Sequence, residues 1–403
     1  MSECRGARQQ GQTLVVASHV IHYEQGGVVH AYGPYSRELD VWAGLFQHVV
    51  IAAPCRKAPP PRDSLAFKAP NISIAPLAET GGRTLGAKMV QAALLPLLVS
   101  GLFRVMAGAD VIHVRCPGNL GLLGALLAPL FGKPMIAKYA GQWNGYPGEV
   151  WTNRFQRWLL RSRWWSKGIV TVYGEWPGQP PQVVPFFTAM MTRRQVEEAA
   201  ASAEEKTLSA TLQILFAGRL AESKRVDMLL AAARLLADRG ASFHVTVLGD
   251  GPERARLESL RNAESLNGHV TFAGAVPFDE MMGWYKRSHV LVLPSRNEGW
   301  PKVLAEAMCH GLVCIATDRG LMPWLLEGRG LVVRPDDPRQ IADSIERLAG
   351  DPREYRRLSR AASLWARQHS LEGLGEALRE LMREKWAPAG PQDPKSVSLS
   401  PLL

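Results

Sequence analysis

Two glutamates separated by seven residues, Glu298 and Glu306, are the side chains best placed for chemistry in this sequence. They follow the apolar run Val290–Leu293, and Pro301 between them suits the first turn of a helix, where its missing N–H has no intrahelical partner. The first N–H groups of that helix form a positive dipole end that favours phosphate. These groups belong to Lys302, Val303 and Leu304. Two glutamates considered on their own are more often solvent-exposed or at a helix cap than catalytic, so the neighbouring residues decide the interpretation.

A second group of polar residues follows the apolar run Leu212–Ala217. It comprises Gly218, Arg219 and Lys224. Two cations beside a glycine turn can clamp a diphosphate, the arginine as a bidentate fork and the lysine as a point charge. Farther along, the turn 249–252 (Gly-Asp-Gly-Pro) lets another backbone segment approach closely. Together these residues predict a site for a ligand that carries phosphates and vicinal hydroxyls.

The elements that must position these residues are short β-branched runs alternating with helix-length segments. In the front half the runs are Thr13–Ala17, Val49–Ala53, Val111–Val114, Met135–Ala137 and Ile169–Val172. In the back half they are Leu212–Ala217, His244–Leu248, Val270–Ala273, Val290–Leu293 and Val313–Thr317. Strands that are apolar throughout indicate parallel sheets covered on both faces. The predicted fold class is therefore α/β, with two Rossmann-like, doubly wound domains that face a central cleft.

A polar, Ala/Glu-rich stretch between the two series of strands sets the expected domain boundaries. We predict an N-terminal domain over 1–187, a linker over 188–208 and a C-terminal domain over 209–370. A C-terminal helix over 371–387 is expected to pack back towards the N-terminal domain. The segment 388–403, rich in proline and serine, is expected to be disordered.

The back half resembles the family 4 glycosyltransferases, also described as glycosyl transferases group 1, which adopt the GT-B fold. The matching motifs run in order from 212 to 352. They are Gly218-Arg219-Leu220 with Lys224, Gly249-Asp250-Gly251-Pro252, Phe272-Ala273-Gly274, Pro294-Ser295 with Glu298-Gly299, and Glu306-Ala307-Met308 with Gly311.

The resemblance implies a role for each matching residue. Arg219 and Lys224 are expected to hold the diphosphate of a nucleotide-sugar donor, and Glu298 to stabilise positive charge at the anomeric carbon. Glu306 is expected to hold the ribose hydroxyls. The remaining expected donor-binding residues are Gly218, Gly299, Trp300, Lys302, Val303, Leu304, Gly274 and Val276. Family members retain the anomeric configuration, and no Asp-x-Asp metal motif occurs here, so neither a metal nor another cofactor is expected besides the nucleotide-diphosphate sugar as co-substrate.

The front half, which the resemblance makes the acceptor domain, departs from the family pattern. A glycine pair usually follows the first strand, and the candidate here, Gly26-Gly27, lies unusually far along the chain. The expected His-Gly after the Met135–Ala137 strand is absent. His19, His22 and His113 lie near strand ends and are interpreted as structural, with no catalytic role assigned.

The charge of the chain is uneven. Of 47 Lys and Arg against 37 Asp and Glu, residues 1–190 hold 18 and 9, whereas residues 191–403 hold 29 and 28. The segment 154–167 (RFQRWLLRSRWWSK) mixes Arg and Lys with Trp, as interfacial membrane segments do, although a domain helix with buried aromatics and solvated arginines fits equally well. The apolar stretch Leu85–Ala107 is interrupted by Lys88, Gln91, Pro96 and Arg104 and is interpreted as a packed helix, with a surface-seeking helix as the alternative. An anionic membrane surface is thus an expected partner, whereas no recognition motif supports nucleic acid.

These observations predict a retaining glycosyltransferase that transfers a sugar to a lipid-linked or cell-surface glycan precursor. Five cysteines without a Cys-x-x-Cys pair, and a polar N-terminal segment, favour a cytoplasmic protein, peripheral on the inner face of the membrane. Two alternatives stay open. One is another GT-B enzyme, such as a sugar-nucleotide epimerase or a polysaccharide synthase; the other is a non-catalytic GT-B binding module.

Overall fold

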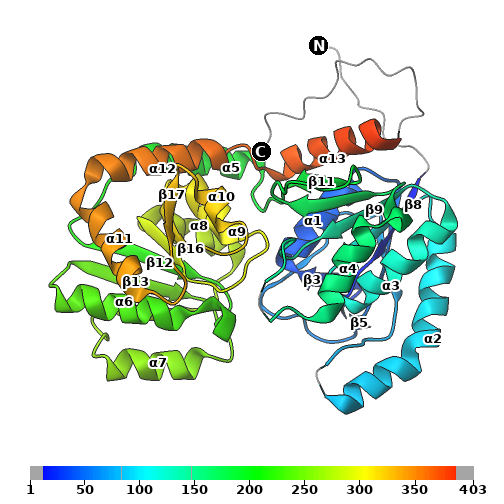
Figure 1. Cartoon of the computed structure of the whole chain (residues 1–403), viewed down its shortest axis with the longest axis horizontal. Helices are drawn as coiled ribbons and strands as arrows, with labels where there is room; N and C mark the ends of the chain where they lie inside the picture. Colours follow the sequence, from blue (N-terminus) through cyan, green and yellow to red (C-terminus); the bar gives the residue numbers. More distant parts are fainter. Residues whose placement is uncertain (1–11, 83, 147, 387–403) are drawn as a thin grey trace, which may run out of the picture. The chain divides into compact units, whose positions relative to one another are not determined.

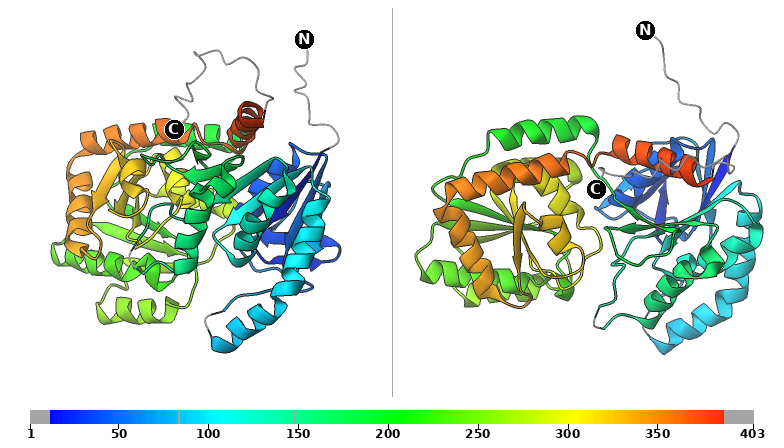
Figure 2. Two further views of the ribbon diagram at one scale, coloured as in Figure 1. Left: turned by 45° about the vertical axis from the view of Figure 1, so that its right-hand side comes forward. Right: turned by 45° about the horizontal axis from the view of Figure 1, so that its top comes forward.

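The computed structural model describes residues 12–82, 84–146 and 148–386. The chain forms two compact units, one made of Met1–Thr188 with Leu371–Leu403 and the other of Ala189–Ser370 (Figures 1 and 2). Each unit has its own parallel sheet. The predicted tail 388–403 lies outside the described residues.

Unit 1 is built on a seven-stranded parallel sheet in the order β11-β10-β9-β8-β1-β4-β7. Its strands are β1 (Thr13–Ala17), β4 (His48–Ala53), β7 (Ile72–Pro76), β8 (Val111–Cys116), β9 (Met135–Tyr139), β10 (Ile169–Tyr173) and β11 (Val183–Phe186). Its helices are α1 (Gly33–Ala43), α2 (Leu85–Ala107), α3 (Asn119–Leu127), α4 (Trp151–Arg161) and α13 (Leu371–Trp386), with short 3-10 turns η1 (Ala128–Phe131) and η2 (Arg163–Trp165). Every residue of β8, β9 and β10 is buried, as expected for a parallel sheet covered on both faces.

A small sheet that the sequence reasoning did not predict is inserted into unit 1. It has the order β5-β2-β3-β6, with β2 (His22–Gln25), β3 (Val28–Tyr32), β5 (Cys55–Arg56) and β6 (Ser64–Ala66). β2 and β3 form an antiparallel hairpin that occupies the connection from β1 to α1. This hairpin explains the long separation between the first strand and the glycine pair at 26–27.

Unit 2 is built on a six-stranded parallel sheet in the order β14-β13-β12-β15-β16-β17. Its strands are β12 (Leu212–Ala217), β13 (Phe243–Leu248), β14 (Val270–Gly274), β15 (Val290–Leu293), β16 (Val313–Thr317) and β17 (Gly330–Val333). Its helices are α5 (Arg193–Glu204), α6 (Val226–Asp238), α7 (Arg254–Ala263), α8 (Phe278–Arg287), α9 (Lys302–Cys309), α10 (Met322–Leu326), α11 (Pro338–Gly350) and α12 (Pro352–Ala366), with the 3-10 turn η3 (Glu222–Lys224). The predicted class, two doubly wound α/β domains, is confirmed.

The expected linker 188–208 is not a connecting segment. Most of it is α5, which starts with a complete capping box between Thr192 and Gln195 and packs on α8, α9 and α12 within unit 2. Buried Val196, Ala199 and Ala200 form its apolar face, so the Ala/Glu pattern that suggested a polar linker is that of an amphipathic helix. The C-terminal helix α13 belongs to unit 1, where it packs on α1.

Candidate active site in unit 2

The sheet of unit 2 reverses its strand order between β12 and β15, which are neighbours in space although β13 and β14 lie between them in sequence. Ligands of open parallel sheets bind beyond the carboxyl ends of the strands at such a reversal. Lys224 follows β12 and Glu298 follows β15. Their side chains form an ion pair, with the Lys224 side chain 26% and the Glu298 side chain 13% exposed. The structure thus brings together two residues that the sequence placed in separate motifs.

Backbone segments meet closely at this edge of the sheet. The N–H of Gly218 donates to Leu248 O (3.0 Å), and the N–H of Gly249 donates to Gly274 O (2.8 Å). A Cβ on Gly249 would lie 1.9 Å from Gly218 O, and one on Gly251 would lie 2.3 Å from Leu220 O. Both glycines also have positive φ. The prediction that this turn admits another backbone is confirmed: the loop after β13 packs directly on the loop after β12.

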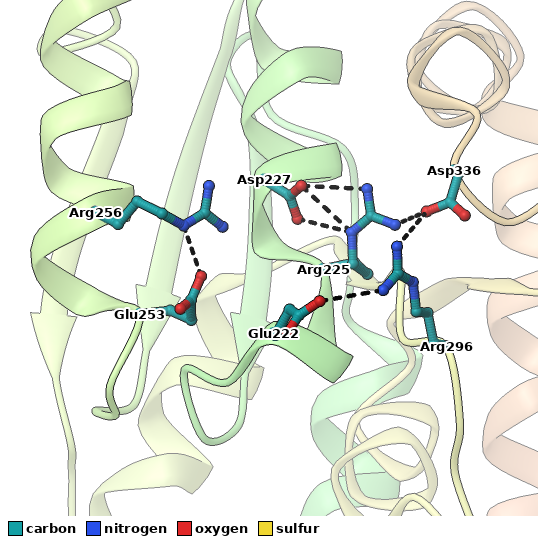
Figure 3. A network of polar contacts seen from close by, with 7 residues as sticks. All are labelled: Glu222, Arg225, Asp227, Glu253, Arg256, Arg296 and Asp336. Atoms are coloured by element: carbon teal, nitrogen blue, oxygen red, sulfur yellow. Dashed lines mark hydrogen bonds and ion pairs between the residues drawn. The ribbon is translucent and has the colours of Figure 1, made fainter. Parts of the chain in front are cut away.

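A polar network that the sequence reasoning missed holds the loops around Lys224 and Glu298 (Figure 3). Arg225, directly after Lys224, has a left-handed backbone (φ 51°) and forms ion pairs with Asp227 and with Asp336. Arg296, two residues before Glu298, contacts Asp336 (3.9 Å) and Glu222 (3.4 Å).

A main-chain bond adds to this network, since the N–H of Arg296 donates to Ser223 O (2.8 Å). The loops after β12, β15 and β17 are therefore tied together beside the Lys224–Glu298 pair. Three arginine–carboxylate contacts between loops could not be found from spacing, because the partners lie 40 to 111 residues apart in the chain.

Glu306 lies in the second turn of α9 and is only 7% exposed. Its Oε2 accepts a hydrogen bond from the hydroxyl of Tyr285 in α8 (2.7 Å). Burial and the neighbouring Glu306 carboxylate raise the pKa of Tyr285 well above its ordinary value. Tyr285 is a second residue that the sequence reasoning missed; it orients the carboxylate proposed for ribose.

Arg219 is exposed and, within the described part of the chain, its side chain forms no ion pair. This distinguishes it from Lys224, whose ammonium is already held by Glu298. An arginine at the carboxyl edge of the sheet that is not neutralised by a neighbouring carboxylate is available to an anionic ligand.

Two of the expected donor residues already have contacts within unit 2. The N–H of Leu304 donates to Pro301 O (3.0 Å) in the first turn of α9, and the Leu304 side chain is fully buried. Trp300 is buried in an aromatic cluster, with its ring 6.0 Å from Trp365 and 5.6 Å from His369. Its indole therefore packs the core of unit 2, because a large aromatic ring gains more from burial than from the loop surface. Gly299 lies in the loop between β15 and α9, and Lys302 and Val303 lie in the first turn of α9.

The other expected donor residues lie in two places. Val276 is half-buried in the loop between β14 and α8, next to Gly274. Gly26 and Gly27 belong to unit 1, where both have positive φ and form the tip of the β2–β3 hairpin. No atom lies within 4 Å of a Cβ built on either glycine, so the turn conformation is what requires glycine there.

The histidines of unit 1 divide into two kinds. His22 and His113 are fully buried, and burial lowers their pKa values to about 4 and about 3, so both are neutral core residues, as interpreted from the sequence. His19 differs, because it follows β1 at the point where the sheet of unit 1 reverses between β1 and β8. A Cβ on Gly118, after β8, would lie 2.2 Å from its Nδ1. His19 is exposed at this edge, and the absence of a side chain on Gly118 leaves room for its ring.

A buried ionic cluster lies in the same unit. Glu38 of α1 accepts from Arg115 (2.6 Å) and from Lys138 (2.7 Å), and the three side chains are nearly inaccessible. Burial lowers the pKa of Lys138 to about 8. Since two cations share one carboxylate, the cluster carries a net positive charge into the sheet of unit 1. Among the described residues, no three His, Cys, Asp or Glu side chains gather as they would around a metal ion.

The aromatic and basic segment 154–167 is partly buried in unit 1 and partly exposed. Leu159, Leu160 and Trp165 are buried in the core of unit 1, whereas Trp158 and Trp164 are exposed. Arg157 is paired with Glu149 in a largely buried site. One face of the segment is thus a packed domain helix and the other presents tryptophan and arginine to solvent.

The fold of the chain is similar to that of several solved structures. Over 94% of the chain, the structure is similar to a sucrose-phosphate synthase from Thermosynechococcus elongatus, with a TM-score of 0.70, 20% identity and all of that chain covered. It is also similar over 93% of its length to Anabaena HepE in complex with UDP and glucose, with a TM-score of 0.68, 15% identity and all of that chain covered. The protein has the GT-B fold.

Sequence comparison relates unit 2 to a family of glycosyltransferases. Residues 211–351 match the family model described as glycosyl transferases group 1. The chain is 34% identical over 174 residues to an alpha-D-kanosaminyltransferase of Streptomyces kanamyceticus, covering 42% of this chain and 45% of that protein. It is 35% identical over 159 residues to a D-inositol 3-phosphate glycosyltransferase of Arthrobacter sp. (strain FB24), covering 38% of each. The matched segments span less than half the length of these relatives.

Proposed function

We propose that the protein is a glycosyltransferase that moves a sugar from a nucleotide-diphosphate donor to a hydroxyl of a lipid-linked or cell-surface glycan precursor. The observation that carries this proposal is the Lys224–Glu298 pair at the strand-order reversal of unit 2. The match of 211–351 to glycosyl transferases group 1 supports it.

The proposed donor site follows from the charges at the carboxyl edge of the sheet. Arg219, which no carboxylate neutralises among the described residues, binds the diphosphate. Lys224 has three N–H donors and can keep its bond to Glu298 while it donates to a phosphate oxygen. Glu306, oriented by Tyr285, accepts hydrogen bonds from the ribose hydroxyls. Both cations stabilise the charge that develops on the leaving diphosphate.

We propose that transfer retains the anomeric configuration and needs no metal. The bond between the anomeric carbon and the phosphate oxygen breaks, and the acceptor oxygen bonds to that carbon on the same face. The acceptor proton passes to the departing phosphate oxygen. Glu298, held beside Lys224, stabilises positive charge on the sugar, and the two cations supply the electrostatic work that a metal performs in other enzymes.

We further propose that the protein is cytoplasmic and peripheral on the inner membrane face, where a lipid-linked acceptor is found. The excess charge of residues 1–190, 18 Lys and Arg against 9 Asp and Glu, supports an anionic partner on the acceptor side.

The first experiment is a thermal-shift screen against uridine, guanosine, adenosine and thymidine diphosphates and their sugars. A donor that binds raises the midpoint in proportion to the logarithm of its concentration. Product analysis with that donor then separates transfer from epimerisation or polymerisation. A protein that binds none of these nucleotides would contradict the proposal, and binding without product would favour a non-catalytic module.

A further inference from the structure

Helix α2 (Leu85–Ala107) presents an unusual apolar surface for a domain helix. It is long and apolar enough to cross a membrane by length and composition alone. Its first thirteen residues, 85–97, contain no buried residue. The large apolar side chains there are exposed: Leu85 76%, Met89 67% and Val90 58%. Figures 1 and 2 show this end of α2 projecting beyond the rest of unit 1.

The second half of the helix is anchored to the domain. Leu98, Leu102 and Met106, four residues apart, are buried and form a stripe against unit 1. Lys133 donates to Ala107 O (2.6 Å) and caps the end of the helix. Because of this anchoring, α2 cannot cross a bilayer over its whole length as long as unit 1 stays folded. The projecting segment is about 20 Å long, at 1.5 Å per residue, which is less than the roughly 30 Å hydrocarbon core.

The exposed apolar surface continues from α2 onto its neighbours. Phe103 of α2 lies 4.7 Å from Phe131 of η1, measured between ring centroids. Leu126 and Leu130, at the end of α3 and in η1, are exposed, and the Trp164 indole donates to Leu126 O (3.2 Å). We call this surface, which comprises the exposed residues of 85–97 with Phe103, Leu126, Leu130 and Trp164, the apolar face of unit 1.

Cations lie beside the apolar face: the Lys133 ammonium is 5.8 Å from the centre of the Phe131 ring, and Arg163 is exposed next to Trp164. Residues 80–174 contain eleven Lys and Arg but only two Asp and Glu, and of these cations Arg115 and Lys138 are buried against Glu38 and add no charge to the surface. Both acids have partners inside the unit: Asp110 accepts from the Thr13 N–H (2.7 Å), and Glu149 is paired with Arg157. Lys88 and Arg104 are exposed on α2 itself. A second copy of the chain would bring like charges together on this face, whereas an anionic surface would match it.

We propose that the apolar face of unit 1 inserts into one leaflet of an anionic phospholipid bilayer, with α2 as the inserted element. The apolar side chains of 85–97 enter the region between head groups and acyl chains, and the Lys88 ammonium extends to the head groups on its aliphatic stem. Trp164, whose indole N–H is held by Leu126 O, presents the exposed part of its apolar ring at the level of the interface. The inference rests on the proposed function in one respect: membrane insertion would bring the donor site of unit 2 to a lipid-linked acceptor.

The test is flotation of the full chain with vesicles of phosphatidylcholine alone or mixed equally with phosphatidylglycerol, without donor or acceptor. We expect binding to the mixed vesicles only. Leu85→Gln/Met89→Gln/Val90→Gln should lower the partition coefficient at least about tenfold, because three exposed apolar side chains no longer enter the bilayer. Lys88→Glu/Arg104→Glu should lower it by about fivefold or more per residue.

The matched control is Val332→Gln/Leu364→Gln, which replaces two exposed apolar residues of unit 2 and should bind like the wild type. Circular dichroism and the unfolding midpoint report whether each variant folds; the triple variant removes no buried side chain. Equal binding by the triple variant and the wild type would overturn the proposal. The proposal would also be overturned if the wild type does not bind the mixed vesicles and instead forms a dimer that is lost in the triple variant. Donor-induced thermal shifts are read separately, so failure of either proposal is recognised without the other.

Discussion

Replacing Lys224 by methionine and Glu298 by glutamine, singly and together, probes whether the pair at the strand-order reversal acts as a unit. Lys224→Met removes a cation from the leaving diphosphate and should lower kcat/KM on the order of 10²-fold, or about 2.7 kcal/mol of transition-state stabilisation. Glu298→Gln keeps the shape of the side chain but not its charge, and should lower mainly kcat. The double variant should lose less than the product of the two single losses, because the residues share one interaction.

The same cycle has an expected size in stability. The two side chains are 26% and 13% exposed, so the pair is intermediate between a surface ion pair and a buried one. Exposed pairs contribute about 0.2–1 kcal/mol, and removing one partner of a buried pair costs about 3–5 kcal/mol. Because solvent still screens this site, we expect a coupling free energy of about 1–2 kcal/mol.

The assay is urea unfolding of the four proteins, with initial rates measured on the same preparations. The matched control is the exposed pair Arg234–Asp238 on α6, replaced by methionine and asparagine, which should couple by at most about 0.5 kcal/mol. Additive effects of Lys224→Met and Glu298→Gln in both stability and activity would refute the reasoning, since independent residues show no coupling.

Four further outcomes test the site and its surroundings. Glu306→Gln should raise the dissociation constant for the donor, and Tyr285→Phe should do so by a smaller factor; calorimetry with unchanged values for both would contradict the ribose assignment. Asp336→Asn should lower kcat several-fold without unfolding unit 2, because the Arg225 and Arg296 contacts loosen; an unchanged kcat would count against positioning by this network. EDTA should leave the transfer rate unaltered, and a loss restored by a divalent cation would rule out the metal-free mechanism. Lys206, just after α5, donates to the main-chain oxygens of Tyr285 (3.0 Å) and Ser288 (2.7 Å) at the end of α8, and burial lowers its pKa to about 8 from 10.5. Between these values the unfolded chain binds more protons, so the wild type should gain stability with rising pH relative to Lys206→Met; urea midpoints of the two proteins that change equally with pH would disprove this.

Ten of the thirteen strands in the two parallel sheets and the principal motifs could be predicted from the sequence because their signals are local, whereas the edge strands β7, β11 and β17 were missed. Buried parallel strands such as Val290–Leu293 are apolar at every position, and the Gly249–Gly251 turn has the composition of a close backbone approach. The prediction of a linker over 188–208 was wrong because its sequence pattern does not specify one structure. An Ala/Glu-rich stretch is compatible with a connecting segment or an amphipathic helix, and only the packing of α5 on α8, α9 and α12 selects the helix.

The site shows the same division. The sequence by itself determined that Lys224 and Glu298 each follow a buried strand, which places both at the carboxyl edge of a parallel sheet. The tertiary structure decided that they touch, because the strand order makes β12 and β15 neighbours. It also decided that Trp300 packs the core and that Tyr285 orients Glu306. Composition likewise revealed an apolar stretch at 85–107, but only the fold buries one half and leaves the other exposed. Local pattern specifies which elements form, whereas contacts between distant residues depend on sheet order and packing, which no short window of sequence contains.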